Sequence, residues 1–98
     1  KYLHSYHYFI VKFKKKISRL KMNSLIENLK KKNIFLGRQY LPIHQHSFYS
    51  KIFKKKFVIA DKYFDQSVQL PIYPSLSLKD LKYVTKTFKS AIIKEKII

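Results

Sequence analysis

The stretch Phe57–Ser77, with the sequence FVIADKYFDQSVQLPIYPSLS, decides the fold because it predicts a helix, a strand directly after it and a proline that ends the strand. Aromatic and small apolar residues at three- and four-residue spacing predict a short helix over Phe57–Gln66. Val68–Leu70 then predicts a brief strand that ends at Pro71, because proline cannot donate a hydrogen bond to a neighbouring strand. A helix followed directly by a strand is typical of a domain that mixes α and β structure.

A longer helix is predicted after this stretch. Ser77 is a favourable N-terminal cap, and the acidic Asp80 stands three residues later, which is the spacing of a capping box. Apolar residues then repeat at intervals of three and four, so an amphipathic helix is predicted over Leu78–Lys94. Its apolar face needs a surface to pack against.

The N-terminal part of the chain predicts one strand and one helix. Tyr2–Phe13 is rich in aromatic and β-branched residues, and its apolar character on both faces favours a central strand. The capping-box spacing of Ser24–Glu27 predicts the start of a helix, with Asn23 as the alternative cap. Asn33 is suited to end this helix in the left-handed conformation.

Between these halves, Ile34–Leu41 predicts a further strand, in which Gly37 marks a bulge or the close approach of another backbone. A polar, lysine-rich loop over Ser47–Lys56 leads into the next helix. The complete order is strand, helix, strand, helix, short strand, helix. Because 98 residues suit a single domain, we expect residues 1–98 to form one α+β domain. The predicted architecture is a short antiparallel or mixed sheet with helices packed on one face.

The charge of the chain admits two interpretations. Lys and Arg number 22 against 5 Asp and Glu, which gives a net charge of +17 and favours an anionic partner such as nucleic acid. Most of these cations are Lys, and Gly is nearly absent, which is the bias of a very AT-rich coding sequence. In that case the lysines are a solvated surface and not a binding face. Both interpretations stay open on composition alone.

Other classes of protein are excluded or disfavoured by composition. The absence of Cys excludes disulfides and thiolate metal sites. No apolar run reaches the roughly 18–20 residues of a membrane span, so no membrane partner is expected. The chain begins with Lys, lacks a signal region and opens almost directly into strand-like sequence. We therefore expect a piece of a longer protein with a cytoplasmic location.

The candidate functional segment is Gly37–His46, which holds the only Gly and two of the four His. Tyr40, Pro42 and His44 stand at alternate positions, so an extended backbone would place Tyr40 and His44 on one face. No Asp or Glu lies near His44 and His46 in sequence, so no metal site is predicted. No combination of nucleophile, base and acid indicates a catalytic residue.

Three stretches together resemble the pyridoxal-phosphate-dependent keto-sugar aminotransferases of the DegT type. Tyr40–His44 is similar to the Tyr-x-Pro-x-His loop of that family. Phe57–Ser77 is similar to its downstream signature of an Ala-acidic pair, a short helix, a Leu-Pro-(apolar)-(aromatic)-Pro segment and a final helix. Tyr6–Val11 is similar to the strand that opens the family's C-terminal region. The order and spacing match over essentially the whole chain.

The resemblance implies a small C-terminal domain of a fold-type I aminotransferase, which is a homodimer in its complete form. The full enzyme would transfer an amino group, commonly from glutamate, to a nucleotide-linked 4-keto-6-deoxy sugar for surface-glycan synthesis, with UDP as the expected nucleotide. The cofactor lysine and the residues that bind pyridoxal phosphate belong to the family's large domain, which precedes this region. Only Tyr40 and His44 are therefore expected to contact substrate, and this chain should bind no cofactor and be inactive alone.

The sequence departs from the family pattern at three places and leaves other interpretations open. Asn33 replaces a usual Gly, Met22 stands near a customary Arg, and His46-Ser47 replaces a common Gln-Pro. We expect the last difference to bear on which sugar is accepted. A loop histidine that only caps backbone groups is the structural alternative for His44. The alternatives for the whole chain are a stand-alone basic nucleic-acid-binding module and a decayed gene remnant, whereas the family assignment implies no specific nucleic-acid partner.

Overall fold

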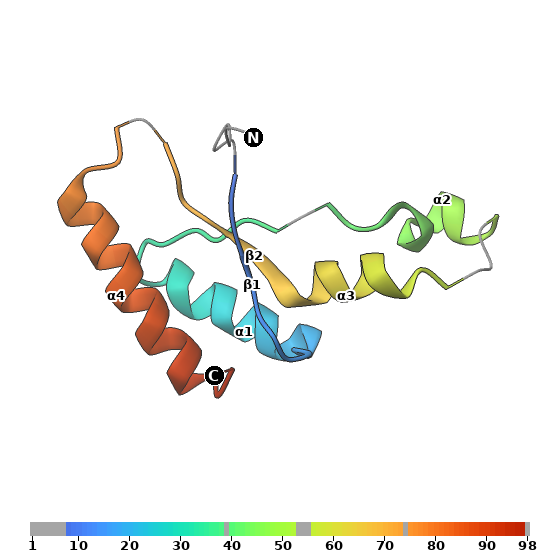
Figure 1. Ribbon diagram of the computed structural model, residues 1–98, viewed down its shortest axis with the longest axis horizontal. Coiled ribbons are helices and arrows are strands. Elements are labelled where there is room, and N and C mark those ends of the chain that lie inside the picture. Colours follow the sequence, from blue (N-terminus) through green and yellow to red (C-terminus); the bar gives the residue numbers. More distant parts are fainter. Residues whose placement is uncertain (1–7, 39, 53–55, 74, 98) are drawn as a thin grey trace, which may run out of the picture.

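The computed structural model describes residues 8–38, 40–52, 56–73 and 75–97. Two short strands, four α-helices and one 3₁₀ turn make up the described chain (Figure 1). In chain order they are β1 (Phe9–Lys12), α1 (Arg19–Lys30), the 3₁₀ turn η1 (Ile43–Gln45), α2 (Ser47–Ser50), α3 (Val58–Gln66), β2 (Ser67–Leu70) and α4 (Leu78–Lys94). The predicted α+β class and the short antiparallel sheet are confirmed.

The sheet consists of β1 and β2, which pair antiparallel with Val11 opposite Val68. On its other edge β2 forms a single bridge to Gly37, whose N–H and C=O both bond to the backbone of Gln69. The strand predicted over Ile34–Leu41 is therefore reduced to one bridge. β2 occupies the middle position in the described residues because it has a neighbour on each edge.

β1 is not the central strand that the sequence predicted. It begins at Phe9, and the part of the prediction before Tyr8 lies outside the described residues. In the described chain β1 pairs only with β2, and the Phe9 side chain stays 48% exposed. In β1, apolar residues on both faces of the strand therefore belong to a partly exposed edge strand of the described sheet and not to a buried central strand.

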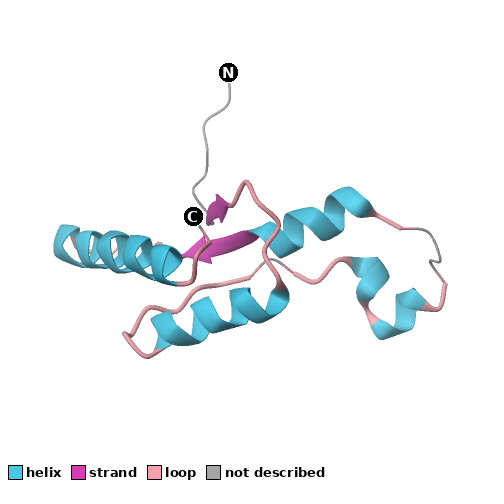
Figure 2. Ribbon diagram, turned by 90° about the horizontal axis from the view of Figure 1, so that it is seen from below, coloured by secondary structure: helices cyan, strands magenta, loops and turns pink. Residues whose placement is uncertain are grey.

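The core lies between one face of the sheet, α1 and α4. Val11 and Val68 point to the same face because they are directly opposite in the register. Val68 is fully buried, and the partly buried Val11 packs against the same cluster. The buried apolar members are Phe13, Ile17, Met22, Leu25, Leu29, Ile34, Val68, Val84, Phe88, Ala91, Ile92 and Ile97. Figure 2 shows the strands at the middle of the molecule with the helices around them.

Helix α1 begins five residues before the predicted capping box. Its N-cap is Ser18, whose hydroxyl accepts a hydrogen bond from Lys21 N at 3.1 Å. Ser24 lies inside the helix instead, and its hydroxyl donates to Glu95 at 3.2 Å. The early start is favoured by packing, because it brings Met22 into the core with no exposed surface. The capping-box prediction was therefore wrong.

The C-terminal end of α1 and the bounds of α4 agree with the sequence predictions. Asn33 has a φ of 62°, and the following N–H of Ile34 bonds back to Leu29 O at 2.9 Å, which closes α1 as predicted. Helix α4 has the predicted bounds, and Ser77 caps it by accepting from Asp80 N at 3.1 Å. Helix α3 begins one residue later than predicted.

Gly37 is a position at which a larger side chain is expected to cost stability. A Cβ at Gly37 would lie 2.7 Å from Gln69 Oε1 and 3.2 Å from Gln69 Cβ. Gly37→Ala should therefore lower the free energy of unfolding by roughly 1 kcal/mol, the lower end of the cost of overpacking. Thermal denaturation of Gly37→Ala and of Gly37→Ala with Gln69→Ala checks this, because the second change removes Gln69 Oε1, the nearer of the two atoms. Equal losses in both variants would contradict the clash.

Candidate functional site

The candidate segment forms an arm, here defined as residues 40–52, that projects away from the sheet and from α1 and α4 (Figure 1). It contains η1 and α2, which pack on each other. The part predicted as a loop after His46 thus begins with a short helix, Ser47–Ser50. Contacts between polar side chains at η1 and the helix α3 hold the base of the arm.

His44 is the central residue at the base of the arm. Its Nε2 lies 2.6 Å from Oδ1 of Asp61, in the first turn of α3. The ring centroid lies 4.8 Å from that of Phe57, and the side chain is only 14% exposed. The imidazole is therefore held on one side by a carboxylate and covered on another by an aromatic ring.

Gln45 and Arg19 extend this contact into a network. Gln45 donates from Nε2 to the same oxygen of Asp61 and accepts at Oε1 from Arg19 Nη2 at 2.8 Å. Arg19 Nε donates to Asp65 Oδ1 at 3.0 Å. We call the four residues Arg19, Gln45, Asp61 and His44 the latch. It joins the start of α1, the arm and α3 through side chains alone.

The chain has two arginines: Arg19 belongs to the latch, and Arg38 contacts the same Phe64 ring as Arg19. Their guanidinium carbons stand 5.4 Å and 4.4 Å from the ring centroid of Phe64, and Arg38 also donates to Phe64 O at 2.8 Å. Burial lowers the pKa of Arg38, while the charge of Asp65 opposes that effect. A planar guanidinium can stack on a ring and bond at the same time, which a lysine ammonium does less well.

The charge state of Asp61 determines how strongly it accepts the hydrogen bonds from His44 and Gln45 that hold the arm. Desolvation alone raises the pKa of Asp61, but hydrogen bonds from Gln45 and His44 and the positive charges of His44 and Arg19 together lower it below 3.8. A carboxyl whose folded pKa is depressed stabilises the fold above its unfolded pKa and loses that contribution as the pH falls through the folded pKa.

We therefore expect the base of the arm to loosen below about pH 4, the ordinary range of an aspartate. Amide chemical shifts of residues 41–46 followed against pH provide the measurement. The transition should disappear in Asp61→Asn and persist in Asp65→Asn, since Asp65 does not contact the arm. If residues 41–46 of Asp61→Asn showed the transition at the same pH, the transition would belong to another titrating group.

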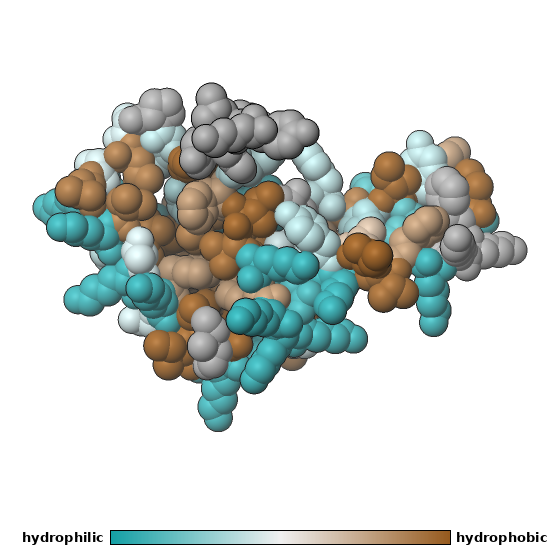
Figure 3. Space-filling view, viewed as in Figure 1, coloured by the Kyte–Doolittle hydropathy of each residue, from teal (hydrophilic) through white to brown (hydrophobic). Residues whose placement is uncertain are grey.

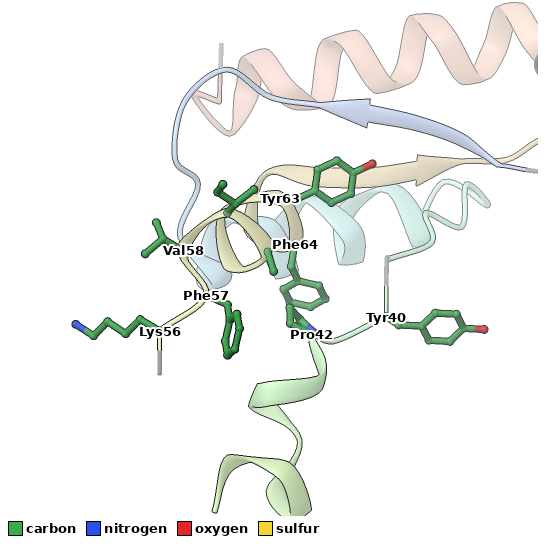
Figure 4. Close-up of a pocket in the computed structure, with 9 residues that line it drawn as sticks. Tyr40, Pro42, Lys56, Phe57, Val58, Tyr63 and Phe64 are labelled. Atoms are coloured by element: carbon green, nitrogen blue, oxygen red, sulfur yellow. The ribbon is translucent and has the colours of Figure 1, made fainter. Parts of the chain in front are cut away.

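Tyr40 and His44 are not brought to one face by an extended backbone, because the chain turns into η1 at Ile43. Tyr40 is 89% exposed, and Figure 4 shows its ring pointing away from Pro42. It lines the rim of an open pocket of about 870 Å³, whereas His44 lines a neighbouring pocket of about 370 Å³. Pro42 and Phe57 border both pockets.

Sequence reasoning identified His44 but missed its partners. Asp61 was predicted only as a residue of the helix over Phe57–Gln66, and Gln45 and Arg19 were not singled out. Asp61 follows His44 by 17 positions, so spacing alone gives no sign of the contact. The one available signal was that Arg19 is one of only two arginines in a lysine-rich chain.

The described residues do not fit a pyridoxal phosphate site. Asp61 and Asp65 line a small cavity of about 240 Å³ with three lysines, but both carboxylates already bond to His44, Gln45 and Arg19. In the described part of the chain, no group of three His, Asp or Glu could hold a metal ion. None of the helices described is long and apolar enough to cross a membrane. The hydrogen-bonding groups of the latch and the two adjoining pockets are suited to holding a ligand.

Residues 1–89 match the DegT/DnrJ/EryC1/StrS aminotransferase family. The uncharacterized protein MJ1066 of Methanocaldococcus jannaschii is 37% identical over 81 residues, which are 78% of this chain and 21% of that protein. The spore coat polysaccharide biosynthesis protein SpsC of Bacillus subtilis is 28% identical over 93 residues, which are 91% of this chain and 24% of that protein.

Two solved structures share the fold. A putative sugar aminotransferase, Spr1654 from Streptococcus pneumoniae in its PMP form, superimposes with a TM-score of 0.82 at 24% identity, over 91% of this chain and 23% of that one. Helicobacter pylori PseC, an aminotransferase involved in the biosynthesis of pseudoaminic acid, gives 0.77 at 17% identity, over 90% of this chain and 24% of that one. The chain thus spans about a quarter of the length of its relatives. By the match over residues 1–89, it belongs to the DegT/DnrJ/EryC1/StrS aminotransferase family.

Proposed function

We propose that this chain is the C-terminal domain of a longer pyridoxal-phosphate-dependent sugar aminotransferase, to which it contributes part of the substrate pocket. The observation that carries the proposal is the family match over residues 1–89 of a chain that spans only 21% and 24% of two relatives. The remaining three quarters of such a protein would hold the cofactor.

The proposed reaction transfers an amino group from glutamate to a nucleotide-linked 4-keto-6-deoxy sugar. Three of the similar proteins are named for sugar amination or polysaccharide synthesis, which supports a sugar substrate. A surface glycan is the expected product, and a cytoplasmic homodimer is the expected form. Pyridoxal phosphate, when bound to the longer protein, would accept and donate the amino group.

Tyr40 and His44 are the residues that we assign to substrate contact. Tyr40 is exposed at the rim of the larger pocket, where its phenol is available to a ligand. His44 borders the adjacent pocket and is fixed by Asp61. Pro42 borders both pockets, so one extended ligand such as a nucleotide-sugar could reach both side chains.

The apolar surface of the arm and α3 supports a role within a larger protein. Phe48, Ile52 and Ile59 are 68%, 61% and 86% exposed. Figure 3 shows apolar residues gathered on the projecting arm. Surfaces of this kind in a folded protein are usually covered by another protein surface.

The isolated chain is accordingly expected to self-associate through this surface. Ile59→Lys should shift the sedimentation coefficient toward that of a monomer, because a charge on the contact surface opposes burial. Leu20→Lys is the matched control, since Leu20 is 82% exposed and belongs to α1, not to the arm or α3. An equal shift in both variants would show that net charge and not this surface governs association.

The experiment that tests the function starts from the coding sequence upstream of this chain. We expect an in-frame large domain with a lysine that binds the cofactor. The longer protein should show the absorbance of bound pyridoxal phosphate and transfer the amino group of glutamate to a UDP-4-keto-6-deoxy sugar. The 98-residue chain alone should do neither. Cofactor absorbance on the isolated chain would contradict the proposal.

A further inference from the structure

The contact between His44 and Asp61 determines which ring nitrogen of His44 carries hydrogen. An ionised carboxylate only accepts hydrogen bonds, and the lowered pKa of Asp61 keeps this carboxyl ionised near neutral pH. The 2.6 Å contact from His44 Nε2 to Asp61 Oδ1 therefore requires a hydrogen on Nε2. In a neutral imidazole the other nitrogen, Nδ1, is then an acceptor.

Nδ1 of His44 is available to a ligand. Among the described residues it has no hydrogen-bond partner. The buried side-chain polar atoms without a partner in the described chain are Arg38 Nε and Gln66 Oε1, so Nδ1 of His44 is not sealed from solvent. The ring lines an open pocket of about 370 Å³ together with Pro42 and Phe57.

The rest of the latch keeps Asp61 directed at His44. Gln45 donates to the same carboxylate oxygen, and its carbonyl oxygen is held by Arg19 at 2.8 Å. Arg19 is held in turn by Asp65 at 3.0 Å. A side chain fixed by two partners loses little further freedom when a ligand binds, which favours affinity.

We infer that the latch fixes neutral His44 as the Nε2–H tautomer and presents Nδ1 as an acceptor for a hydroxyl group of the sugar, not for a phosphate. A hydroxyl donates to Nδ1, whereas an ionised phosphate only accepts and has no hydrogen bond to make there. Asp61, Gln45 and Arg19 are positioning residues in this assignment, since they act through His44. The inference rests on the proposed function only for the nature of the ligand, because the tautomer belongs to this chain itself.

The first test is nitrogen NMR of the isotope-labelled 98-residue chain, which reports the protonation of each ring nitrogen. At about pH 8.5, His44 should show a protonated Nε2 and a bare Nδ1. His46 is an internal reference, because its Nε2 lies 2.9 Å from Leu41 O and should be protonated independently of Asp61. Finding the hydrogen on Nδ1 of His44 would overturn the inference.

Variants separate the latch from general effects of charge. Asp61→Asn should lose the strict preference of His44 for the Nε2–H tautomer, because an amide both donates and accepts, and should leave His46 unchanged. Asp65→Asn removes the same charge one helical turn away without a contact to His44 and should preserve the tautomer. An unchanged His44 in Asp61→Asn would overturn the inference, and the tautomer of the unmodified chain stands as a test even if a variant unfolds.

Dimethyl phosphate, a phosphate diester that carries no P–OH group and can only accept hydrogen bonds, is the probe for the ligand. Titrated at the same pH, it should leave the Nδ1 resonance of His44 no more perturbed than that of His46, although it will contact surface lysines. A saturable shift confined to His44 Nδ1 would overturn the assignment to a hydroxyl. These outcomes are independent of turnover by the longer protein, so a failure of the proposed function and a failure of this inference can be told apart.

Discussion

Leu25→Ala is expected to lower the free energy of unfolding by about 3 kcal/mol, within the usual range for a leucine truncated in a core. Leu25 has no exposed surface and lies in α1 where this helix faces α4 and the sheet. The substitution removes buried apolar area and leaves a cavity that a small core fills only in part. A domain of this size is stabilised by roughly 5–15 kcal/mol, so the variant should lose a large share of its stability.

Leu20→Ala is the matched control for this prediction. Leu20 lies in the same helix, but its side chain is 82% exposed, so the same truncation should change stability by less than about 0.5 kcal/mol. Chemical denaturation followed by circular dichroism measures both variants. Similar losses in the two would show that α1 does not pack as described.

His44→Ala is expected to lower kcat/KM of the longer protein for the keto-sugar by roughly 10- to 100-fold. The loss corresponds to about 1.5–3 kcal/mol, the usual contribution of a hydrogen bond to a charged group such as Asp61. Bound-cofactor absorbance should be unaffected, because the cofactor residues lie outside this chain. Steady-state kinetics with the sugar as the varied substrate provide the measurement.

His46→Ala is the control for the arm. His46 is exposed and contacts only the backbone of its own segment, at Leu41 O. Although His46 lies at a place where the sequence departs from the family pattern, it lines neither pocket, so its truncation should change kcat/KM for the keto-sugar by less than about threefold. A loss in His46→Ala as large as that in His44→Ala would indicate a general distortion of the arm and not a contact of His44.

Elements with strong local signals were predicted well. Helix α4 has its predicted bounds, since Ser77 caps its first turn and apolar residues at helical spacing continue along its whole length. Asn33 adopts its predicted left-handed conformation because the chain has to leave α1 there. Gly37 approaches the backbone of Gln69 as predicted for a glycine in strand-like sequence.

Elements decided by packing were predicted poorly. Two caps competed for α1, and burial of Met22 favoured the start after Ser18 over the one after Ser24. β1 has the composition of a central strand, but a strand's position depends on partners that its own sequence does not encode.

The candidate site shows the same division. The motif pointed to His44, but the contact with Asp61 arises when α3 folds back against the arm, and periodicity within either segment contains no information about that meeting. The turn η1 also removed the shared face that an extended chain would have given Tyr40 and His44. Residue type therefore identified one member of the latch, and tertiary structure supplied the other three.

The most direct test of the central claim is the half-reaction of the longer protein, followed by absorbance. Glutamate should convert the pyridoxal form of the bound cofactor to the pyridoxamine form, and a UDP-4-keto-6-deoxy sugar should return it. The conversion back to the pyridoxal form by the sugar should be slower in His44→Ala, while the step with glutamate should keep its rate. The account would be contradicted by a longer protein that binds the cofactor but whose pyridoxamine form is not converted back to the pyridoxal form by any nucleotide-linked keto-sugar.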